Sequence, residues 1–116
     1  MMSTPTIDRA TFDALRDTTG AEFVAELVDT FLEEAPAMLA ELRGAFAAGD
    51  ADRFRRAAHS LKSNSNTFGA TALGALAREL ELGGIAKAAE GGGAALEALT
   101  QEYERVAAAL AEMRHA

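Results

Sequence analysis

Residues 57–70 read AAHSLKSNSNTFGA and contain His59, one of two histidines in the chain; the other, His115, is the penultimate residue. Together with the residues before them, they place small and apolar side chains at helical spacing, namely Phe54, Ala57 or Ala58, Leu61, Ser65 and Phe68. At 100° per residue, His59 lies about 160° from Leu61 around such a helix. The stretch therefore predicts a helix over residues 51–67 that buries one face and exposes His59 on the other.

The residues at both ends of this helix are typical of helix boundaries. Asp50 precedes it and belongs to the residue types favoured at an N-cap. Gly69 follows it and suits the turn that closes a helix. The whole chain is rich in Ala, Leu, Glu and Arg, which favour helices, and poor in β-branched residues. We therefore expect an all-α protein.

Two helices are expected before residue 50. Asp8 can cap a short first helix with Phe12 and Leu15 on its apolar face. A capping-box spacing between Thr19 and Glu22 predicts the start of a long helix over residues 20–48. Its apolar stripe is wide: Phe23, Leu27, Phe31, Ala35, Met38, Leu42 and Phe46, flanked by Val24, Val28, Leu32 and Leu39. Pro36 lies inside this stripe, so we expect a kink or a local break near Ala35.

Two further helices are expected after the central one. The first begins near Ala70 and has Leu73, Leu76, Ala77 and Leu80 on its apolar face, but the glycines after residue 82 leave its end open. The last covers about residues 92–114, with Leu96, Leu99, Tyr103, Val106 and Leu110 at helical spacing and Met113 following. The connections are short, so neighbouring helices should run antiparallel. At 116 residues the chain suits a single domain, residues 1–116, in which 1–6 form a tail.

Composition excludes several classes of protein. There is no cysteine, which excludes disulfides and thiolate metal sites. No apolar run reaches the roughly 18 residues that span a membrane, and the N-terminus lacks the pattern of a secretory signal. The formal charge of −7 argues against nucleic acid and anionic membrane as partners. We therefore expect a cytoplasmic protein, and its start at Met1 favours a stand-alone one.

The charges are unevenly distributed around His59. No acidic residue occurs between Asp52 and Glu79, whereas this interval holds five basic ones: Arg53, Arg55, Arg56, Lys62 and Arg78. A basic region on an acidic protein can face an anion or an acidic partner. The alternative is that charges simply fluctuate along the chain.

The setting of His59 meets the needs of a phosphoryl acceptor. Such a histidine must be exposed, must have a neutral ring whose nitrogen can attack, and needs nearby positive charge and small neighbours. Lys62, three residues on, can reach a phosphoryl group on the ring. Ser63, one turn along, leaves the ring accessible, and Asn66 extends the polar surface. The alternative is an incidental surface histidine.

Other chemistries lack their residues. No second ligand accompanies His59, so a metal site is not expected, and His115 is interpreted as incidental. The serines near His59 share its exposed helix and have no orienting acid, which argues against a nucleophilic triad. The glycines at 91–93 lack the lysine and spacing of a phosphate-binding loop.

The sequence from His59 to Ala70 resembles a known signature. HSLKSNS followed by Gly69-Ala70 is similar to H-x-L-K-[GS]-x-x-x-x-x-G-A, the pattern of histidine-containing phosphotransfer (Hpt) domains. The upstream LVDTFLEEAPAMLAELRGAF and the downstream LGALARELE also resemble that family, so the likeness covers roughly residues 7–110. It implies an antiparallel four-helix bundle with an additional short N-terminal helix.

The resemblance also implies roles for individual residues. His59 would be phosphorylated on Nε2, Lys62 would neutralise the phosphate, and Gly69 would be the turn glycine. Ser63 stands where many members have glycine. The implied partners are receiver domains of response regulators and hybrid sensor histidine kinases, whose aspartate and Mg²⁺ carry the chemistry. The chain itself would be a monomer without cofactor or enzymatic activity.

Partner docking is expected on the first two helices and on the basic region. The candidates are Phe12, Val28 and Leu32, together with Arg55 and Arg56. The alternative for the three apolar residues is that they belong to the core.

Three alternative functions are open to a chain of this kind. The first is a phosphorelay intermediate that takes a phosphoryl group from a receiver aspartate and passes it to another receiver. The second is an interaction module of the same fold that docks a receiver or kinase without phosphotransfer. The third is a passive helical bundle without privileged residues, which a buried His59 would favour.

Overall fold

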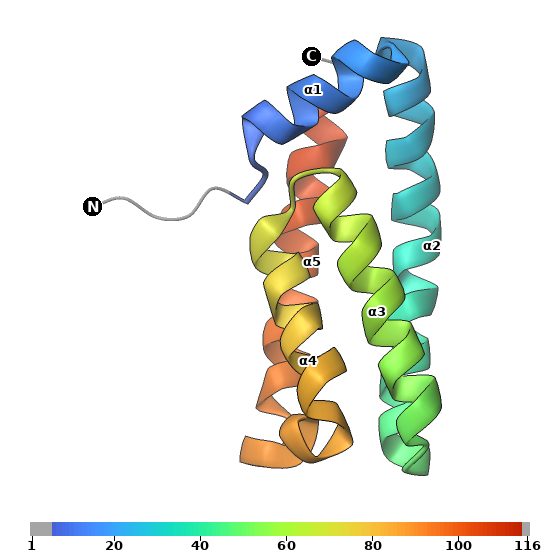
Figure 1. The fold of residues 1–116 in the computed structure, drawn as a ribbon, viewed down its shortest axis with the longest axis vertical. Helices are drawn as coiled ribbons and strands as arrows, with labels where there is room; N and C mark the ends of the chain where they lie inside the picture. The colour runs from blue at the N-terminus through green and yellow to red at the C-terminus, as the bar shows by residue number, and fades with distance from the viewer. Residues whose placement is uncertain (1–5, 115–116) are drawn as a thin grey trace, which may run out of the picture.

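The computed structural model describes residues 6–114, and the regular secondary structure within them is all helical (Figure 1). The elements are α1 (Arg9–Thr19), α2 (Ala21–Ala48), α3 (Ala51–Thr67), α4 (Thr71–Ala89), the 3₁₀ turn η1 (Glu90–Gly92) and α5 (Ala94–Met113). The all-α prediction is confirmed, and α3 has the predicted bounds. His115 and most of the expected tail, residues 1–5, lie outside the described residues.

Helices α2 to α5 form a bundle along the long axis of the molecule, and α1 lies across one end of it (Figure 1). The central pair is α3 and α4, with α2 packed on α3 and α5 packed on α4. Helix α1 contacts both α2 and α3. This is the predicted four-helix bundle with an additional short N-terminal helix. None of the described helices is long and apolar enough to cross a membrane.

The buried face of α2 is narrower than its apolar stripe. It consists of Val24, Val28, Phe31, Ala35, Leu39, Leu42 and Ala45. Phe23, expected on the buried line, has 48% of its surface exposed. Of the kink or local break expected near Ala35, the break does not occur: α2 continues through Pro36. The buried residues on either side of Pro36 hold the helix in the bundle despite the missing backbone donor.

The helix ends confirm some capping predictions and correct one. The side chain of Asp8 accepts a hydrogen bond from Thr11 N, and that of Asp50 accepts one from Arg53 N. The capping box of Thr19 and Glu22 is not formed. Gly20 occupies the cap position of α2, and the Thr19 hydroxyl donates to the carbonyl oxygen of Leu15 instead.

A glycine interrupts α4 one turn before its end. Gly84 has φ 67° and ψ −161°, which interrupts the helical backbone after Gly83. The following turn nevertheless stays helical to Ala89 and buries Ala88. Helix α5 begins at Ala94, two residues later than predicted, and buries Leu96, Leu99, Glu102, Val106, Leu110 and Met113.

The turn between α3 and α4 is tied to α1 through Gly69. This residue has φ +82°, and a Cβ there would lie 2.8 Å from the backbone oxygen of Asp8. The backbone nitrogen of Asp8 donates to the Gly69 oxygen over 2.8 Å. Gly69 is therefore the turn glycine that the sequence predicts, and its lack of a side chain allows the start of α1 to approach.

Candidate functional site

His59 lies on the solvent-facing side of α3, as its helical position predicts. Its side chain is 57% exposed, whereas Leu61 is completely buried. The buried side of α3 comprises Phe54, Ala57, Ala58, Leu61 and Ser65. Ser65 is accommodated there because its hydroxyl donates to the carbonyl oxygen of Leu61 over 2.6 Å. The packing of α3 thus fixes the direction in which His59 emerges.

A carboxylate from α4 contacts His59. Nδ1 of His59 lies 2.8 Å from Oε2 of Glu81, and Nζ of Lys62 lies 2.8 Å from Oε1 of the same residue. The Glu81 side chain is only 15% exposed. Three side chains from two helices therefore form one continuous set of polar contacts.

The charge on Glu81 determines which nitrogen of His59 carries the proton. The hydrogen bond from Lys62, followed by that from His59, holds the pKa of Glu81 below its usual value of 4.5. Glu81 is therefore ionised near neutral pH, and an ionised carboxylate only accepts hydrogen bonds. Nδ1 must be the donor in this contact. In the neutral ring Nε2 then holds the free lone pair.

Glu81 was not predicted as a site residue. In the sequence it lies just outside the interval without acidic residues. Although the interval contains no acidic residue, folding brings the Glu81 carboxylate against two of its residues, His59 and Lys62. A signal was present. Ala70 lies midway between His59 and Glu81, so an antiparallel hairpin that turns near Ala70 places the two side by side.

The other predicted site residues occupy different surroundings. Lys62 is 25% exposed and engaged by Glu81, so its charge is already compensated. Ser63 is exposed and small, one turn from His59. Asn66 lies further along, over Gly74 of α4, where a Cβ would come within 2.9 Å of Asn66 Cγ. Gly69 positions the hairpin turn rather than the ring.

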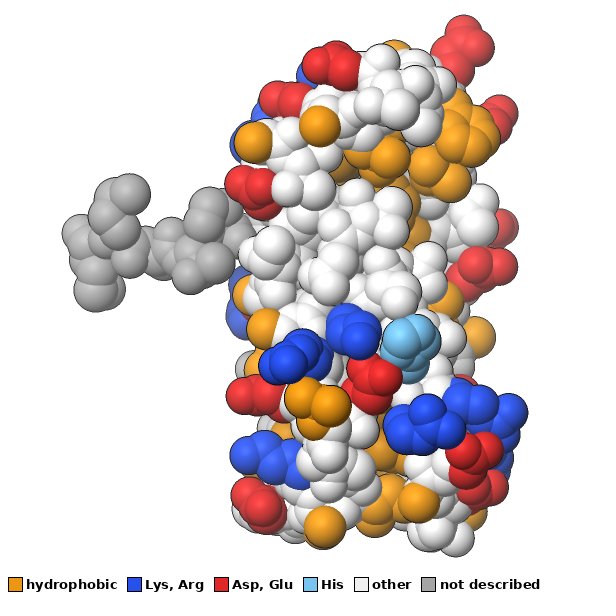
Figure 2. Space-filling model, viewed as in Figure 1, with side chains coloured by type: hydrophobic (Ala, Val, Ile, Leu, Met, Phe, Trp, Pro, Cys, Tyr) orange, Lys and Arg blue, Asp and Glu red, His pale blue; other side chains and the backbone are white. Residues whose placement is uncertain are grey.

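The basic region near His59 is partly neutralised. Arg55 lies 2.8 Å and Arg56 lies 3.1 Å from the two carboxylate oxygens of Asp52, at the start of α3. Both arginines are exposed. Figure 2 shows the histidine on this face with Lys and Arg side chains gathered around it and Asp and Glu side chains between them.

Two of the apolar docking candidates are core residues. Phe12 is 1% exposed and Val28 is completely buried, so neither offers surface to a partner in this structure. Leu32 is half-buried at the edge of the core. The exposed large apolar side chains in the described residues are Phe23 and Leu82. Leu82 is 69% exposed and lines a surface hollow together with Glu81 and Arg55.

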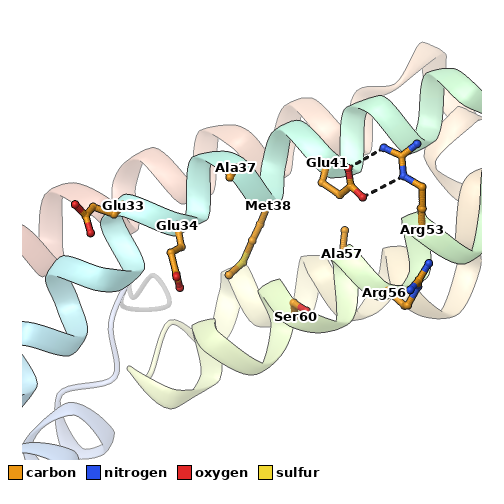
Figure 3. A pocket seen from close by; sticks show the side chains of 9 residues that line it. All are labelled: Glu33, Glu34, Ala37, Met38, Glu41, Arg53, Arg56, Ala57 and Ser60. Carbon is orange, nitrogen blue, oxygen red and sulfur yellow. Dashed lines mark hydrogen bonds and ion pairs between the residues drawn. The ribbon is translucent and has the colours of Figure 1, made fainter.

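A groove between α2 and α3 borders the site. It extends to Ser60, the neighbour of His59 in the chain, and Met38 reaches from α2 toward α3 across it (Figure 3). At one end Arg53 donates two hydrogen bonds to Glu41, over 3.0 and 2.7 Å (Figure 3). These bonds hold the pKa of Glu41 below its usual value. Within residues 6–114 no three metal-ligating side chains come together.

Comparisons with known proteins agree with this arrangement. No curated protein sequence matches the chain. The crystal structure of histidine-containing phosphotransfer protein B (HptB) from Pseudomonas aeruginosa PAO1 is similar, with a TM-score of 0.86 and 29% sequence identity over 97% of each chain. The Hpt domain family matches residues 26–109, most of the bundle including the whole of α3 and α4. The chain therefore belongs to the Hpt domain family, the histidine phosphotransfer domains of phosphorelays.

Proposed function

We propose that His59 is the phosphoryl acceptor of this domain. It takes the group from the phosphorylated aspartate of one receiver domain and passes it to the aspartate of another. The observation that carries the proposal is the contact between Nδ1 of His59 and Glu81, which leaves Nε2 of an exposed ring as the nucleophile. Receiver domains are the partners that the family implies.

The transfer needs no catalytic group on this chain besides the ring of His59, which is the nucleophile. The Nε2 lone pair attacks phosphorus, an N–P bond forms, the bond between phosphorus and the aspartyl oxygen breaks, and that oxygen leaves as a carboxylate. Nδ1 keeps its proton throughout, and the positive charge that develops on the ring is stabilised by ionised Glu81. The second transfer is the reverse reaction on another aspartate. The domain is thus a relay intermediate without kinase or phosphatase activity of its own.

The residues around His59 have supporting roles in this proposal. Lys62 holds Glu81 in place and supplies positive charge near the transferred oxygens. The small side chain of Ser63 leaves the approach to the ring open, and Asn66 extends the polar surface along α3. Arg55, Arg56 and Leu32, with Leu82 next to Glu81, are the surface residues proposed to contact a receiver. Mg²⁺ belongs to the receiver.

The experiment that tests the proposal is phosphotransfer from phosphorylated receiver domains of the source organism. The intact chain should acquire phosphate that is labile in acid and stable in alkali, as expected for phosphohistidine. His59→Gln should abolish this labelling, whereas His115→Gln, which removes the other histidine, should leave it unchanged. Phosphate retained by His59→Gln would exclude His59 as the acceptor. Receiver binding without any labelling of the intact chain would favour a docking module.

A further inference from the structure

Arg78 on α4 differs from the other described basic side chains because its charge has no partner within residues 6–114. Each of the other Lys and Arg side chains within residues 6–114 lies within 4.0 Å of a carboxylate oxygen. Arg78 is exposed and forms no hydrogen bond or ion pair with any described residue. Its guanidinium is therefore available to an external anion.

The register of the α3–α4 hairpin places Arg78 beside the phosphoryl site. Asn66 lies against Gly74 at one level, and His59 lies against Glu81 two turns further along. On α3, Lys62 lies four residues before Asn66, in the direction of His59. On α4, Arg78 lies four residues after Gly74, in the direction of Glu81. Lys62 and Arg78 therefore lie opposite each other on adjacent helices, within one turn of His59 and Glu81.

Arg78 is important for binding an anion because the charge of Lys62 is already compensated. The Lys62 ammonium lies 2.8 Å from Glu81, so the two groups together carry no net charge. A phosphoryl group on His59 adds negative charge to this neighbourhood. Arg55 and Arg56 share the single carboxylate of Asp52. Arg78 is thus the cation near the site that pairs with no carboxylate among the described residues.

We propose that Arg78 binds the oxygens of the phosphoryl group during its transfer to His59 and while His59 carries it. The planar guanidinium can donate two parallel hydrogen bonds to phosphoryl oxygens, which a lysine ammonium does not reproduce. Arg78 transfers no proton and forms no covalent bond. This role rests on the proposed function of His59 and adds a positioning residue from a second helix, which the sequence signature does not contain.

The test uses phosphoramidate as the phosphoryl donor, so that no receiver is required. Nε2 of His59 attacks phosphorus, the P–N bond of the donor breaks, and ammonia leaves. Arg78→Ala is expected to lower the initial rate of His59 phosphorylation roughly two- to fivefold, the size of one exposed ion pair. Arg78→Lys should retain part of the rate. Added salt should slow the native protein more than Arg78→Ala, because it screens the interaction.

Arg9→Ala is the matched control, since it removes the same charge from an exposed arginine of α1. Thermal unfolding of each variant monitors the fold. An Arg78→Ala rate equal to that of Arg9→Ala, or Arg78→Lys as slow as Arg78→Ala, would overturn the role of Arg78 and leave His59 as the acceptor. Labelling that persists in His59→Gln would instead overturn the proposed function itself.

Discussion

Nδ1 of His59 on α3 lies 2.8 Å from a carboxylate oxygen of Glu81 on α4, and the other oxygen of Glu81 lies 2.8 Å from Nζ of Lys62. The ring of His59 is therefore oriented by a residue of the neighbouring helix. Because Glu81 is ionised, it accepts a hydrogen bond from Nδ1–H of His59, which leaves the free lone pair of the neutral ring on Nε2. The pairing of α3 with α4 thus determines which nitrogen of His59 carries the free lone pair.

Glu81→Ala is expected to change the proton distribution on the His59 ring. In the native protein the neutral ring should carry its proton on Nδ1, because the Nδ1–H group can donate a hydrogen bond to Glu81. Without the carboxylate, the form protonated on Nε2 should become populated, and that form cannot attack phosphorus through Nε2. Nitrogen-15 NMR of the imidazole distinguishes the two forms, and phosphorylation by phosphoramidate should slow in parallel.

Glu79→Ala is the control for this change, because Glu79 is an exposed carboxylate on the same helix. It should alter neither the imidazole spectrum nor the rate. Glu81→Gln should be intermediate, since its uncharged amide oxygen can still accept a hydrogen bond from Nδ1–H. An imidazole spectrum of Glu81→Ala identical to that of the native protein would contradict the orienting role of Glu81.

Stability should depend on the ionisation of Glu81 in acid. The hydrogen bond from Lys62, and then that from His59, lowers the pKa of Glu81 in the folded protein from the usual 4.5. A group whose pKa is lowered by folding stabilises the native state fully above its unfolded pKa. This contribution is lost as the pH falls through the lowered folded pKa. The difference in unfolding free energy between the native protein and Glu81→Gln should therefore shrink upon acidification.

Urea unfolding of both proteins between neutral and strongly acidic pH measures this difference. The comparison isolates Glu81, because Glu41, whose pKa is also lowered, is present in both proteins. A difference that stays constant through the acid range would show that the contacts of Glu81 do not favour its ionised form.

The position of α3 and the exposure of His59 could be predicted because both depend on local spacing. Asp50, the buried line through Leu61, and Gly69 lie within one short stretch, and helical periodicity relates them directly. The contact with Glu81 depends instead on how two helices pair across a turn. Side chains 22 residues apart meet only when the register of that hairpin is known.

The exposed apolar side chains of α2 were harder to predict, because the apolar stripe of this helix is wide. Periodicity shows that α2 is apolar around much of its circumference but does not show which part faces the bundle. Packing against the neighbouring helices buries Val28 completely and leaves Phe23 exposed. Leu82 was not predicted as exposed surface, because the end of α4 depends on the backbone conformation of Gly84.

Lys62→Met should slow phosphoryl transfer to His59 roughly tenfold, less than the loss of a donor in a closed oxyanion hole. Methionine keeps most of the apolar stem but removes the ammonium. Oε1 of Glu81, which is inaccessible to solvent, then loses its cation, and the pKa of Glu81 should rise toward its usual value. Carbon-13 NMR of the Glu81 carboxyl group and the phosphoramidate reaction measure the two effects.

Lys87→Met is the matched control, because Lys87 lies in the last turn of α4 and pairs with Glu90, at 3.9 Å. It should leave both the transfer rate and the Glu81 titration unchanged. A Lys62→Met protein that transfers phosphate at the native rate would refute an electrostatic role for Lys62.

Gly69→Ala is expected to destabilise the domain more than Gly49→Ala. Both glycines have positive φ, +82° and +68°, so each alanine incurs a backbone cost of about 1–2 kcal/mol. At Gly49 a Cβ meets nothing within 4 Å, whereas at Gly69 it would lie 2.8 Å from the Asp8 oxygen and 3.0 Å from Thr11 Cβ. Relieving this contact requires α1 to move from the hairpin turn, which should cost roughly a further 1–3 kcal/mol.

Urea unfolding of the two variants measures the difference, and hydrogen exchange at the amide of Asp8 reports the local effect. That amide donates to the Gly69 oxygen, so it should exchange faster in Gly69→Ala and remain protected in Gly49→Ala. Equal destabilisation by the two substitutions would mean that the backbone conformation of Gly69, and not the close approach of α1, is what requires glycine there. In that case α1 would not depend on the hairpin turn for its position.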